Sequence, residues 1–246
     1  MADAAPRAAP GGGYEAVLFD ALGTLVELEP PWPLLQAALA DTHGIELGEA
    51  EAKHAMVAEM TYYKRHHVEG RDDSSLEELR ARCAAVLQEQ LPAAAALSPA
   101  EMREALMRSL RFRPYPDVAP LLGRLRLLGT RTAVVSNWDV SLRAILSELG
   151  LGGLFDELVV SAEAGVTKPG KDIFELALRR LGSPARKALF VGDSLETDVA
   201  GALGAGVRGV LLDRAGNAAV EPGVERIFTL EAVGELVAPP PATLRA

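Results

Sequence analysis

Short apolar runs, each followed by polar residues or glycine, recur along much of the chain. They lie at residues 15–20, 132–136, 158–161, 188–191 and 207–212. Apolar runs of this length, bounded by turn residues, are typical of strands that are buried on both faces of a parallel sheet. Amphipathic stretches with a helical period separate the later runs. This alternation predicts an α/β fold with a doubly wound, Rossmann-like parallel sheet.

The pattern changes between residues 33 and 112, where long stretches rich in Ala, Leu, Glu and Arg follow a helical period without a convincing strand. We therefore expect residues 30–113 to form a smaller all-helical domain, inserted after the first strand. Residues 14–29 and 114–238 would form the α/β core. The two ends, residues 1–13 and 239–246, are rich in Ala, Pro and Gly and are typical of flexible tails.

Composition narrows the class of protein. The chain has 246 residues, of which 49% are hydrophobic, and this is enough for one large core or for a core and a smaller domain. A net charge of -9 argues against a surface that binds nucleic acid. No apolar run is long enough to cross a membrane, and no secretion signal is evident. The lone Cys83 is expected to serve packing, which agrees with a reducing cytoplasm. Nothing here indicates an oligomeric state.

Asp20 stands where the first predicted strand ends, and Gly23 and Thr24 follow in a tight turn. Such a turn exposes the carboxylate while backbone N–H groups face an incoming anion. Asp20 is therefore a candidate nucleophile, and Thr24 a candidate phosphate-binding residue. The alternative is an ordinary polar turn, in which the Thr24 hydroxyl only stabilises the backbone.

Ser136 and Asn137 end the next predicted strand and precede a helix. A hydroxyl, an amide and the N–H groups of a helix N-terminus can all hold phosphate oxygens, so we assign Ser136 to phosphate binding and Asn137 to its support. Both residues would also serve as ordinary helix caps, and Asp139 is the expected cap. Because the carboxyl ends of parallel strands meet at one edge, we expect these residues to lie near Asp20.

Three further charged residues belong to the same predicted edge. Lys168, before Pro169 in a loop, is a fixed cation that can pair with a carboxylate and a phosphoryl group, although a solvated lysine is the commoner case. Asp193 and Asp198 follow the strand at 188–191. Two carboxylates about 4 Å apart repel each other by about 4 kcal/mol at an effective dielectric of about 20. A gathered set of carboxylates therefore favours a cation, and hard oxygen ligands suit Mg²⁺.

Four separated pieces, FDALGTL at 19–25, VVSNWD at 134–139, Lys168-Pro169 and VGDSLETD at 191–198, stand in this order along the chain. Together they resemble the motifs of the haloacid dehalogenase superfamily, whose members are mostly phosphatases. The resemblance covers nearly the whole chain beyond the first tail, and the helical insertion resembles that family's cap domain of the first type.

The resemblance implies a hydrolase, and most specifically a Mg²⁺-dependent phosphatase that acts on a small phosphorylated metabolite through an aspartyl-phosphate intermediate. The implied catalytic residues are Asp20 and Lys168. The implied phosphate-binding residues are Thr24, Ser136, Asn137 and Lys168. The implied metal ligands are Asp20, the backbone carbonyl of Leu22, Asp193 and, through water, Asp198. No nucleic-acid or membrane partner is expected.

Leu22 departs from the family pattern. Phosphatases of this family usually carry a second aspartate there, as general acid and base, and the loss of such a group costs about 10²–10⁴ in rate. A good leaving group or an acid from the cap would compensate. Dehalogenating relatives also lack this aspartate, so a 2-haloacid dehalogenase is the first alternative; a phosphonate-cleaving relative would use a cap lysine, Lys53 or Lys64. A noncatalytic binding module is the third alternative.

Overall fold

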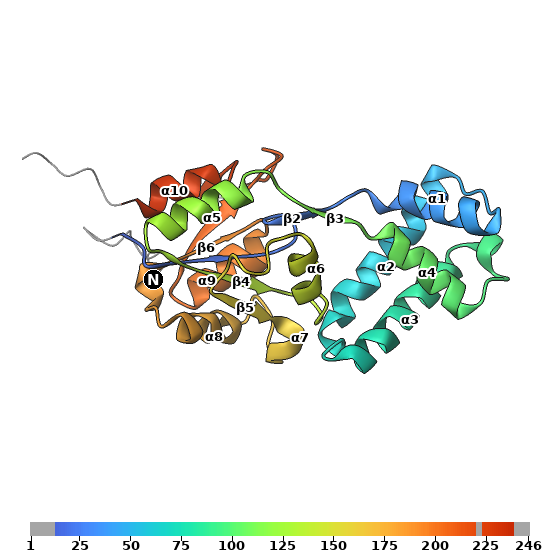
Figure 1. The fold of residues 1–246 in the computed structure, drawn as a ribbon, viewed down its shortest axis with the longest axis horizontal. Helices are drawn as coiled ribbons and strands as arrows, with labels where there is room; N and C mark the ends of the chain where they lie inside the picture. The colour runs from blue at the N-terminus through green and yellow to red at the C-terminus, as the bar shows by residue number, and fades with distance from the viewer. Residues whose placement is uncertain (1–12, 220–222, 239–246) are drawn as a thin grey trace, which may run out of the picture.

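A computed structural model describes residues 13–219 and 223–238. An α/β core lies at one end of the molecule, and helices α1–α4 lie at the other (Figure 1). The predicted tail at 239–246, and all but the last residue of the tail predicted at 1–13, lie outside the described residues. No helix within the described ranges combines the length and hydropathy needed to cross a membrane.

The core is built on a six-stranded parallel sheet with the strand order β5-β4-β1-β6-β7-β8. Its strands are β1 (Ala16–Phe19), β4 (Arg131–Ser136), β5 (Glu157–Val160), β6 (Ala188–Gly192), β7 (Arg208–Leu212) and β8 (Glu225–Ile227). The central strand β1 pairs with β4 on one side and with β6 on the other. The predicted fold class is confirmed, and each of the five predicted runs coincides with a strand to within about one or two residues at either end.

Strand β1 shows why its apolar run is continuous. Val17 and Phe19 point into one hydrophobic cluster, and Ala16 and Leu18 point into the cluster on the opposite face. Since successive side chains of a strand alternate between faces, burial of both faces requires an apolar residue at every position. The run therefore marks a central strand with helices on both sides.

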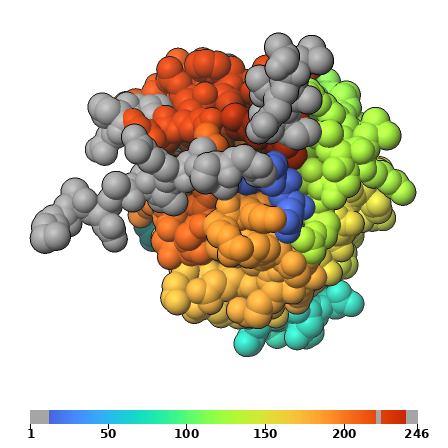
Figure 2. All heavy atoms as spheres, turned by 90° about the vertical axis from the view of Figure 1, so that its left-hand side faces the viewer, coloured from blue at the N-terminus to red at the C-terminus, as the bar shows by residue number. Residues whose placement is uncertain are grey.

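Helices cover both faces of the sheet. The first cluster includes residues of α5 (Val118–Leu127), α6 (Leu142–Glu148) and α10 (Glu231–Val237), and the second includes residues of α8 (Lys171–Leu181) and α9 (Gly201–Gly204). The short α7 (Ser161–Ala164) follows β5. Figure 2 shows the end of the core that faces away from α1–α4. Helices α5 and α10 contact each other, and Arg124 pairs with Glu235 between them.

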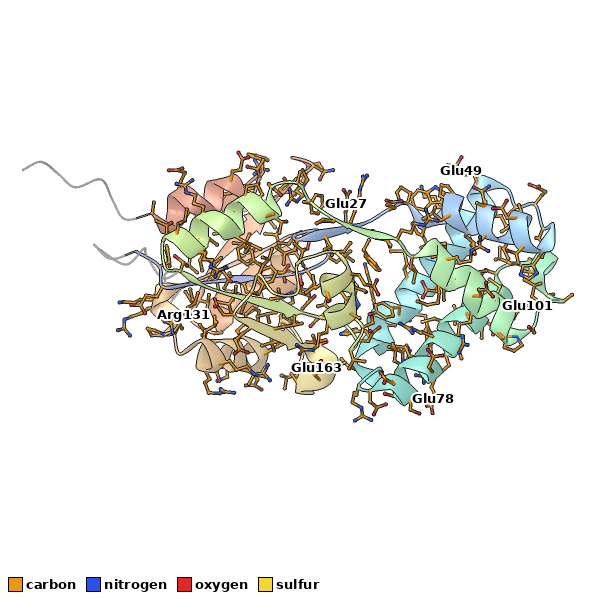
Figure 3. All side chains as sticks on the ribbon, in the orientation of Figure 1. Glu27, Glu49, Glu78, Glu101, Arg131 and Glu163 are labelled. Atoms are coloured by element: carbon orange, nitrogen blue, oxygen red, sulfur yellow. The ribbon has the colours of Figure 1, made fainter. Side chains whose placement is uncertain are left out.

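The four helices at the other end pack around a hydrophobic cluster of their own. They are α1 (Pro31–His43), α2 (Glu49–His66), α3 (Asp73–Glu89) and α4 (Pro99–Ser109), with short 3₁₀ turns at His67–Glu69 and Pro92–Ala94. Capping boxes begin α3 at Asp72 and α4 at Ser98, which satisfies free N–H groups of these helices. Charged residues such as Glu49, Glu78 and Glu101 lie on the outside (Figure 3).

Two short antiparallel strands, β2 (Val26–Leu28) and β3 (Phe112–Pro114), connect these helices to the core. The sequence pattern did not predict β2, β3 or the edge strand β8, because three residues are too few to show a period. All four helices lie within the segment 30–113. The boundaries of that segment as a cap domain stay a prediction.

Candidate active site

Asp20 lies at the carboxyl end of β1, in the middle of the sheet edge. Its N–H donates to the carbonyl of Val191 on β6 at 3.0 Å. In the turn that follows, three N–H groups donate to the carbonyl of Ala21, those of Thr24, Leu25 and Val26. Gly23 has a φ of 79° in this turn, and a Cβ added there would lie 2.2 Å from Oδ2 of Asp193. Glycine is therefore required both by the backbone conformation and by the close approach of Asp193.

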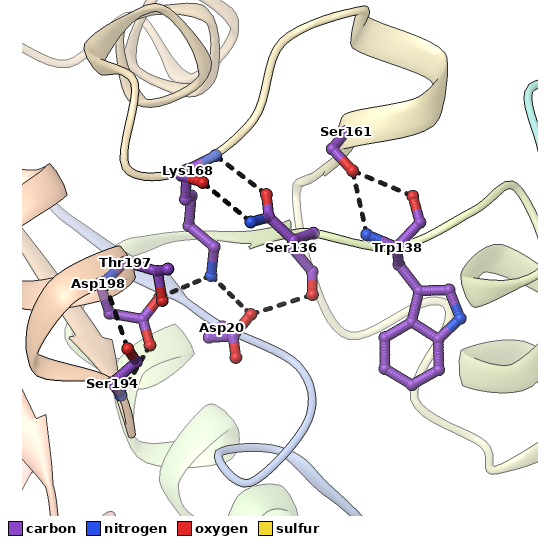
Figure 4. Close-up of polar contacts among 9 residues, drawn as sticks. Asp20, Ser136, Trp138, Ser161, Lys168, Ser194, Thr197 and Asp198 are labelled. Carbon is purple, nitrogen blue, oxygen red and sulfur yellow. Dashed lines mark hydrogen bonds and ion pairs between the residues drawn. The ribbon is translucent and has the colours of Figure 1, made fainter. Parts of the chain in front are cut away.

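Lys168 joins two of the aspartates. Its Nζ donates to Oδ1 of Asp20 at 2.6 Å and to Oδ1 of Asp198 at 2.6 Å (Figure 4). Only 4% of the Lys168 residue is exposed. Burial disfavours the charged ammonium, but the carboxylates of Asp20 and Asp198 outweigh this effect and raise the pKa of Lys168. The ammonium is therefore a fixed positive charge beside the Asp20 carboxylate.

Ser136, at the end of β4, supplies the second donor to the same oxygen. Its Oγ donates to Oδ1 of Asp20 at 2.9 Å. None of the described residues donates a hydrogen bond to the other oxygen, Oδ2. Ser136 and Lys168 thus hold the Asp20 carboxylate by one oxygen and leave the second available to attack.

Asn137 contacts Lys168 rather than Asp20. Its Nδ2 donates to the Lys168 carbonyl at 2.9 Å, and the Lys168 N–H donates to Oδ1 of Asn137 at 2.9 Å. The nitrogen and the oxygen of the Asn137 amide therefore both hold the backbone of Lys168. In this structure Asn137 orients Lys168, and its predicted support of phosphate binding would act through that residue.

Asp193 and Asp198 complete an acidic cluster with Asp20. Each of the three residues offers a carboxylate oxygen within 4.8 Å of the others. Asp198 is buried and accepts from the N–H of Ser194 at 3.0 Å, whereas Asp193 is exposed as a residue but directs its carboxyl toward the cluster. Desolvation of that carboxyl, together with repulsion from the other two aspartates, raises the pKa of Asp193 to about 7. Burial and the charge of Asp20 also raise the pKa of Asp198, against the opposing effect of Lys168.

The donor set of this cluster fits a hard divalent cation. Three carboxylates face one ammonium, and hard oxygen ligands are those that Mg²⁺ prefers. Desolvation is the largest cause of the raised pKa of Asp193, and repulsion from Asp20 and Asp198 adds to it. The backbone carbonyl of Leu22 lies in the turn after Asp20, where Leu22 forms an isolated β-bridge with Val26. That this carbonyl binds the metal stays a prediction.

Thr24 lies deeper than expected. It is fully buried, and its Oγ1 has no hydrogen-bond partner among the described residues. Its carbonyl accepts from Nη2 of Arg214 at 2.9 Å. The Thr24 carbonyl thus supports the turn, and the phosphate-binding role of its hydroxyl stays a prediction.

Arg214 is a site residue that sequence analysis missed. Its guanidinium makes two hydrogen bonds of 2.9 Å to the Asp117 carboxylate, and it lies 3.7 Å from the centre of the Tyr115 ring. It thereby ties the turn after Asp20 to the start of α5. The available signal was its place after the predicted strand at 207–212, at the same sheet edge as the other site residues.

The two lysines of the helical segment that were weighed as alternatives do not reach Asp20 in this structure. Lys53 lies over the ring of Trp32, 5.1 Å from its centre. Lys64 is exposed. Leu22 is partly buried and packs against the core cluster. The structure thus shows no contact between Asp20 and a cap lysine in the described residues.

Comparisons with known proteins agree with this geometry. A family model described as haloacid dehalogenase-like hydrolase matches residues 14–206. A glyceraldehyde 3-phosphate phosphatase of Methanopyrus kandleri is 42% identical over 112 residues, which cover 45% of this chain and 48% of that protein. The match therefore spans about half the length of this curated relative.

Two solved structures are similar over most of the chain. A HAD phosphatase from Thermococcus onnurineus has a TM-score of 0.63 at 28% identity and covers 92% of this chain and 98% of its own. An L-2-haloacid dehalogenase from Xanthobacter autotrophicus has a TM-score of 0.62 at 23% identity, and the match covers 91% of this chain and 98% of the dehalogenase. This likeness shows the shared fold. With its family model matched over most of its length, and with the four motifs together at one sheet edge, the chain belongs to the haloacid dehalogenase-like hydrolases.

Proposed function

We propose that the protein is a Mg²⁺-dependent phosphatase that acts on a small phosphorylated metabolite, with Asp20 as nucleophile. The observation that carries this proposal is the arrangement around the Asp20 carboxylate. One oxygen is held by Lys168 and Ser136, the other accepts no bond from the described residues, and two further aspartates lie beside it. Relatives named as phosphatases support the substrate class.

The first step would be attack of Oδ2 of Asp20 on phosphorus. An O–P bond forms, the bond from phosphorus to the leaving group breaks, and its electron pair leaves with that group. Lys168 would offset the negative charge of the phosphoryl oxygens, and the Ser136 hydroxyl would turn from Oδ1 of Asp20 to donate to one of them. Asn137 holds Lys168 in place through its two backbone contacts.

The second step would be attack of water on the aspartyl-phosphate, which releases phosphate and restores the Asp20 carboxylate. Asp20, Asp193 and the carbonyl of Leu22 would hold Mg²⁺ directly, with Asp198 acting through water. When bound, the ion would supply positive charge that stabilises the transferring phosphoryl group.

Leu22 limits the choice of substrate. Leucine cannot give a proton to a departing alkoxide, whereas an acyl or aryl phosphate has a leaving group that departs as a stable anion. We therefore expect acyl and aryl phosphates to be cleaved faster than alkyl phosphates. The cap helices would select the rest of the substrate, and we expect the protein to act in the cytoplasm.

A 2-haloacid dehalogenase is the second candidate function. Leu22 favours it, because a halide leaves without a proton and the second aspartate is then not needed. In that reaction Oδ2 of Asp20 would attack carbon, and water would cleave the resulting ester. The acidic pair Asp193 and Asp198 has no role in such a reaction, so we rank it lower. A noncatalytic binding module would need neither Lys168 nor this pair.

The test is hydrolysis of p-nitrophenyl phosphate and acetyl phosphate by the purified protein, with and without Mg²⁺. Halide release from 2-chloropropionate is measured in parallel. Mg²⁺-dependent phosphate release that is lost in Asp20→Asn would support the phosphatase. Metal-independent halide release would identify a dehalogenase, and no turnover in any assay would favour the binding module.

A further inference from the structure

A polar contact joins cap helix α2 to the loop after β4. The hydroxyl of Tyr63 donates to Oδ2 of Asp139 at 2.9 Å. The other carboxylate oxygen, Oδ1, accepts from the N–H of Ser141 at 2.7 Å, in the turn that leads into α6. Asp139 is therefore not a simple cap of α6, as its position in the sequence suggested. It is 4% exposed, and it shares its two oxygens between the core and the cap.

Two backbone features bring the same surfaces together. The N–H of Val140 donates to the carbonyl of Gly70 at 3.0 Å, next to the Tyr63 contact. A Cβ added to Gly70 would lie 2.9 Å from Cβ of Asp139, so a glycine is needed for this close approach. His67, 8% exposed, lies between Tyr63 and Gly70 in the sequence, and its Nε2 has no partner among the described residues.

Tyr63 also packs against both hydrophobic clusters. Its ring is partly buried, and it contacts the cluster formed by α1–α4 as well as the core cluster that contains Trp138. Burial, and then the neighbouring Asp139 carboxylate, raise the pKa of Tyr63, so its hydroxyl keeps its proton and remains a donor. The ring and the hydroxyl thus both fasten the cap to the core.

This junction stands next to the active site. Asp139 lies two residues after Asn137 and three after Ser136, the last residue of β4, so a shift of Asp139 would pass along the backbone to the residues that hold Lys168 and Asp20. In this structure Asp20 is only 8% exposed, and a metabolite needs a wider path to its carboxylate. Beside the packed Tyr63 ring, the junction contains hydrogen-bonding groups, which water can replace when the two surfaces separate.

We propose that Tyr63 and Asp139 are positioning residues: their hydrogen bond holds the cap closed over the loop of Ser136 and Asn137, and it breaks when the site opens. The inference deepens the proposed phosphatase function and rests on it for its kinetic part. The bond sets the balance between open and closed molecules, and only the closed molecule has the loop and the cap in place for reaction.

The test compares Tyr63→Phe with Tyr62→Phe, a matched control that removes a hydroxyl from the preceding residue of the same helix. One readout needs no substrate. In a Trp32→Phe background, Trp138 is the only tryptophan, it is 6% exposed, and its quenching by acrylamide reports whether the cap stands open. The other readout is kcat/KM for acetyl phosphate, measured in wild type, Tyr63→Phe, Asp139→Ala and the double variant.

We expect Tyr63→Phe to increase the quenching of Trp138 and to lower kcat/KM about tenfold, which corresponds to about 1.4 kcal/mol. In the Asp139→Ala background the same change should lower kcat/KM less than about twofold, because the carboxylate partner is already gone and the Tyr63 hydroxyl keeps only its 3.4 Å contact with the N–H of residue 139. Asp139→Asn keeps an oxygen acceptor and should retain more activity than Asp139→Ala.

Equal effects of Tyr63→Phe in both backgrounds, or quenching of Trp138 no greater than in Tyr62→Phe, would overturn the proposal. So would a Tyr63→Phe variant that melts earlier with unchanged quenching and kcat/KM, since this marks a merely structural contact. A failed phosphatase assay with increased quenching in Tyr63→Phe would refute the proposed function while leaving the closure of the cap supported.

Discussion

Glu59 should make the stability of the protein depend on pH. This residue of α2 is 4% exposed, and it faces Cys83 of α3 within the cap cluster. Burial raises its pKa from the ordinary value of 4.5 to about 7. The folded protein therefore binds a proton that the unfolded chain releases between these two values. Stability is highest below pH 4.5 as far as this group is concerned, and it falls as the pH rises toward 7.

The magnitude follows from the same values. The two pKa values differ by about 2.5 pH units, and each unit corresponds to about 1.36 kcal/mol, so ionisation of Glu59 costs the folded state about 3 kcal/mol once the pH exceeds its folded pKa. Glu59→Gln has nearly the same shape and does not ionise. It should match wild type at about pH 4, where the carboxyl is mostly protonated in both states, and be more stable by about 3 kcal/mol at about pH 8.

The assay is equilibrium unfolding in urea, followed by far-UV circular dichroism, which is dominated here by the helices. Glu78→Gln is the control, because Glu78 is an exposed glutamate of α3, and its replacement should change stability little at either pH. A difference between wild type and Glu59→Gln that stays constant from about pH 4 to about pH 8 would refute the reasoning, because the carboxyl would then titrate alike in the folded and unfolded chains.

The other predictions concern the active site. Lys168→Met removes the cation beside Asp20 and should lower kcat for acetyl phosphate by about 10²–10³, measured under saturating Mg²⁺. Asn137→Ala removes only the two contacts that hold Lys168 and should lower kcat about tenfold, so a loss as large as that of Lys168→Met would argue for a direct role. Arg214→Ala leaves the Asp117 carboxylate without its bidentate partner and should destabilise the protein by about 2–3 kcal/mol in urea unfolding. Gly23→Ala places a methyl group against the Asp193 carboxyl and should weaken Mg²⁺ binding in calorimetry, whereas an unchanged affinity would contradict this expectation.

Much of the fold followed from local sequence, and the exceptions have a physical cause. The run at 188–191 predicted β6 because both faces of that strand are buried, and a central strand leaves a continuous apolar pattern. The strand β8 was missed because its three residues lie at the sheet edge, where only Ile227 is buried. The same reasoning explains β2 and β3, whose pairing depends on the entry and exit of the cap helices.

The active site, like the fold, could be predicted from the sequence only in part. Asp20, Ser136 and Asp198 could be placed together because parallel strands deliver their ends to one edge, and the structure joins the first two directly and the third through Lys168. The contacts of Asn137 with Lys168 and of Tyr63 with Asp139 could not be predicted. Each joins residues that are far apart in the sequence, and their meeting depends on packing that no local pattern records.

The balance of charge at the sheet edge separates the two candidate reactions. Three carboxylates and one ammonium give a site with an excess of two negative charges when every aspartate is ionised. At an effective dielectric of about 20, a further anion about 4 Å from one such charge is repelled by about 4 kcal/mol, so neither a phosphate nor a haloacid carboxylate would enter readily. A divalent cation cancels this excess and keeps Asp193 ionised despite a pKa that burial and its neighbours raise to about 7. A metal-independent dehalogenase would gain nothing from Asp193 and Asp198, because they repel its substrate and no cation offsets them. The acidic pair therefore favours phosphoryl transfer, even though Leu22 is shared with the dehalogenating relatives.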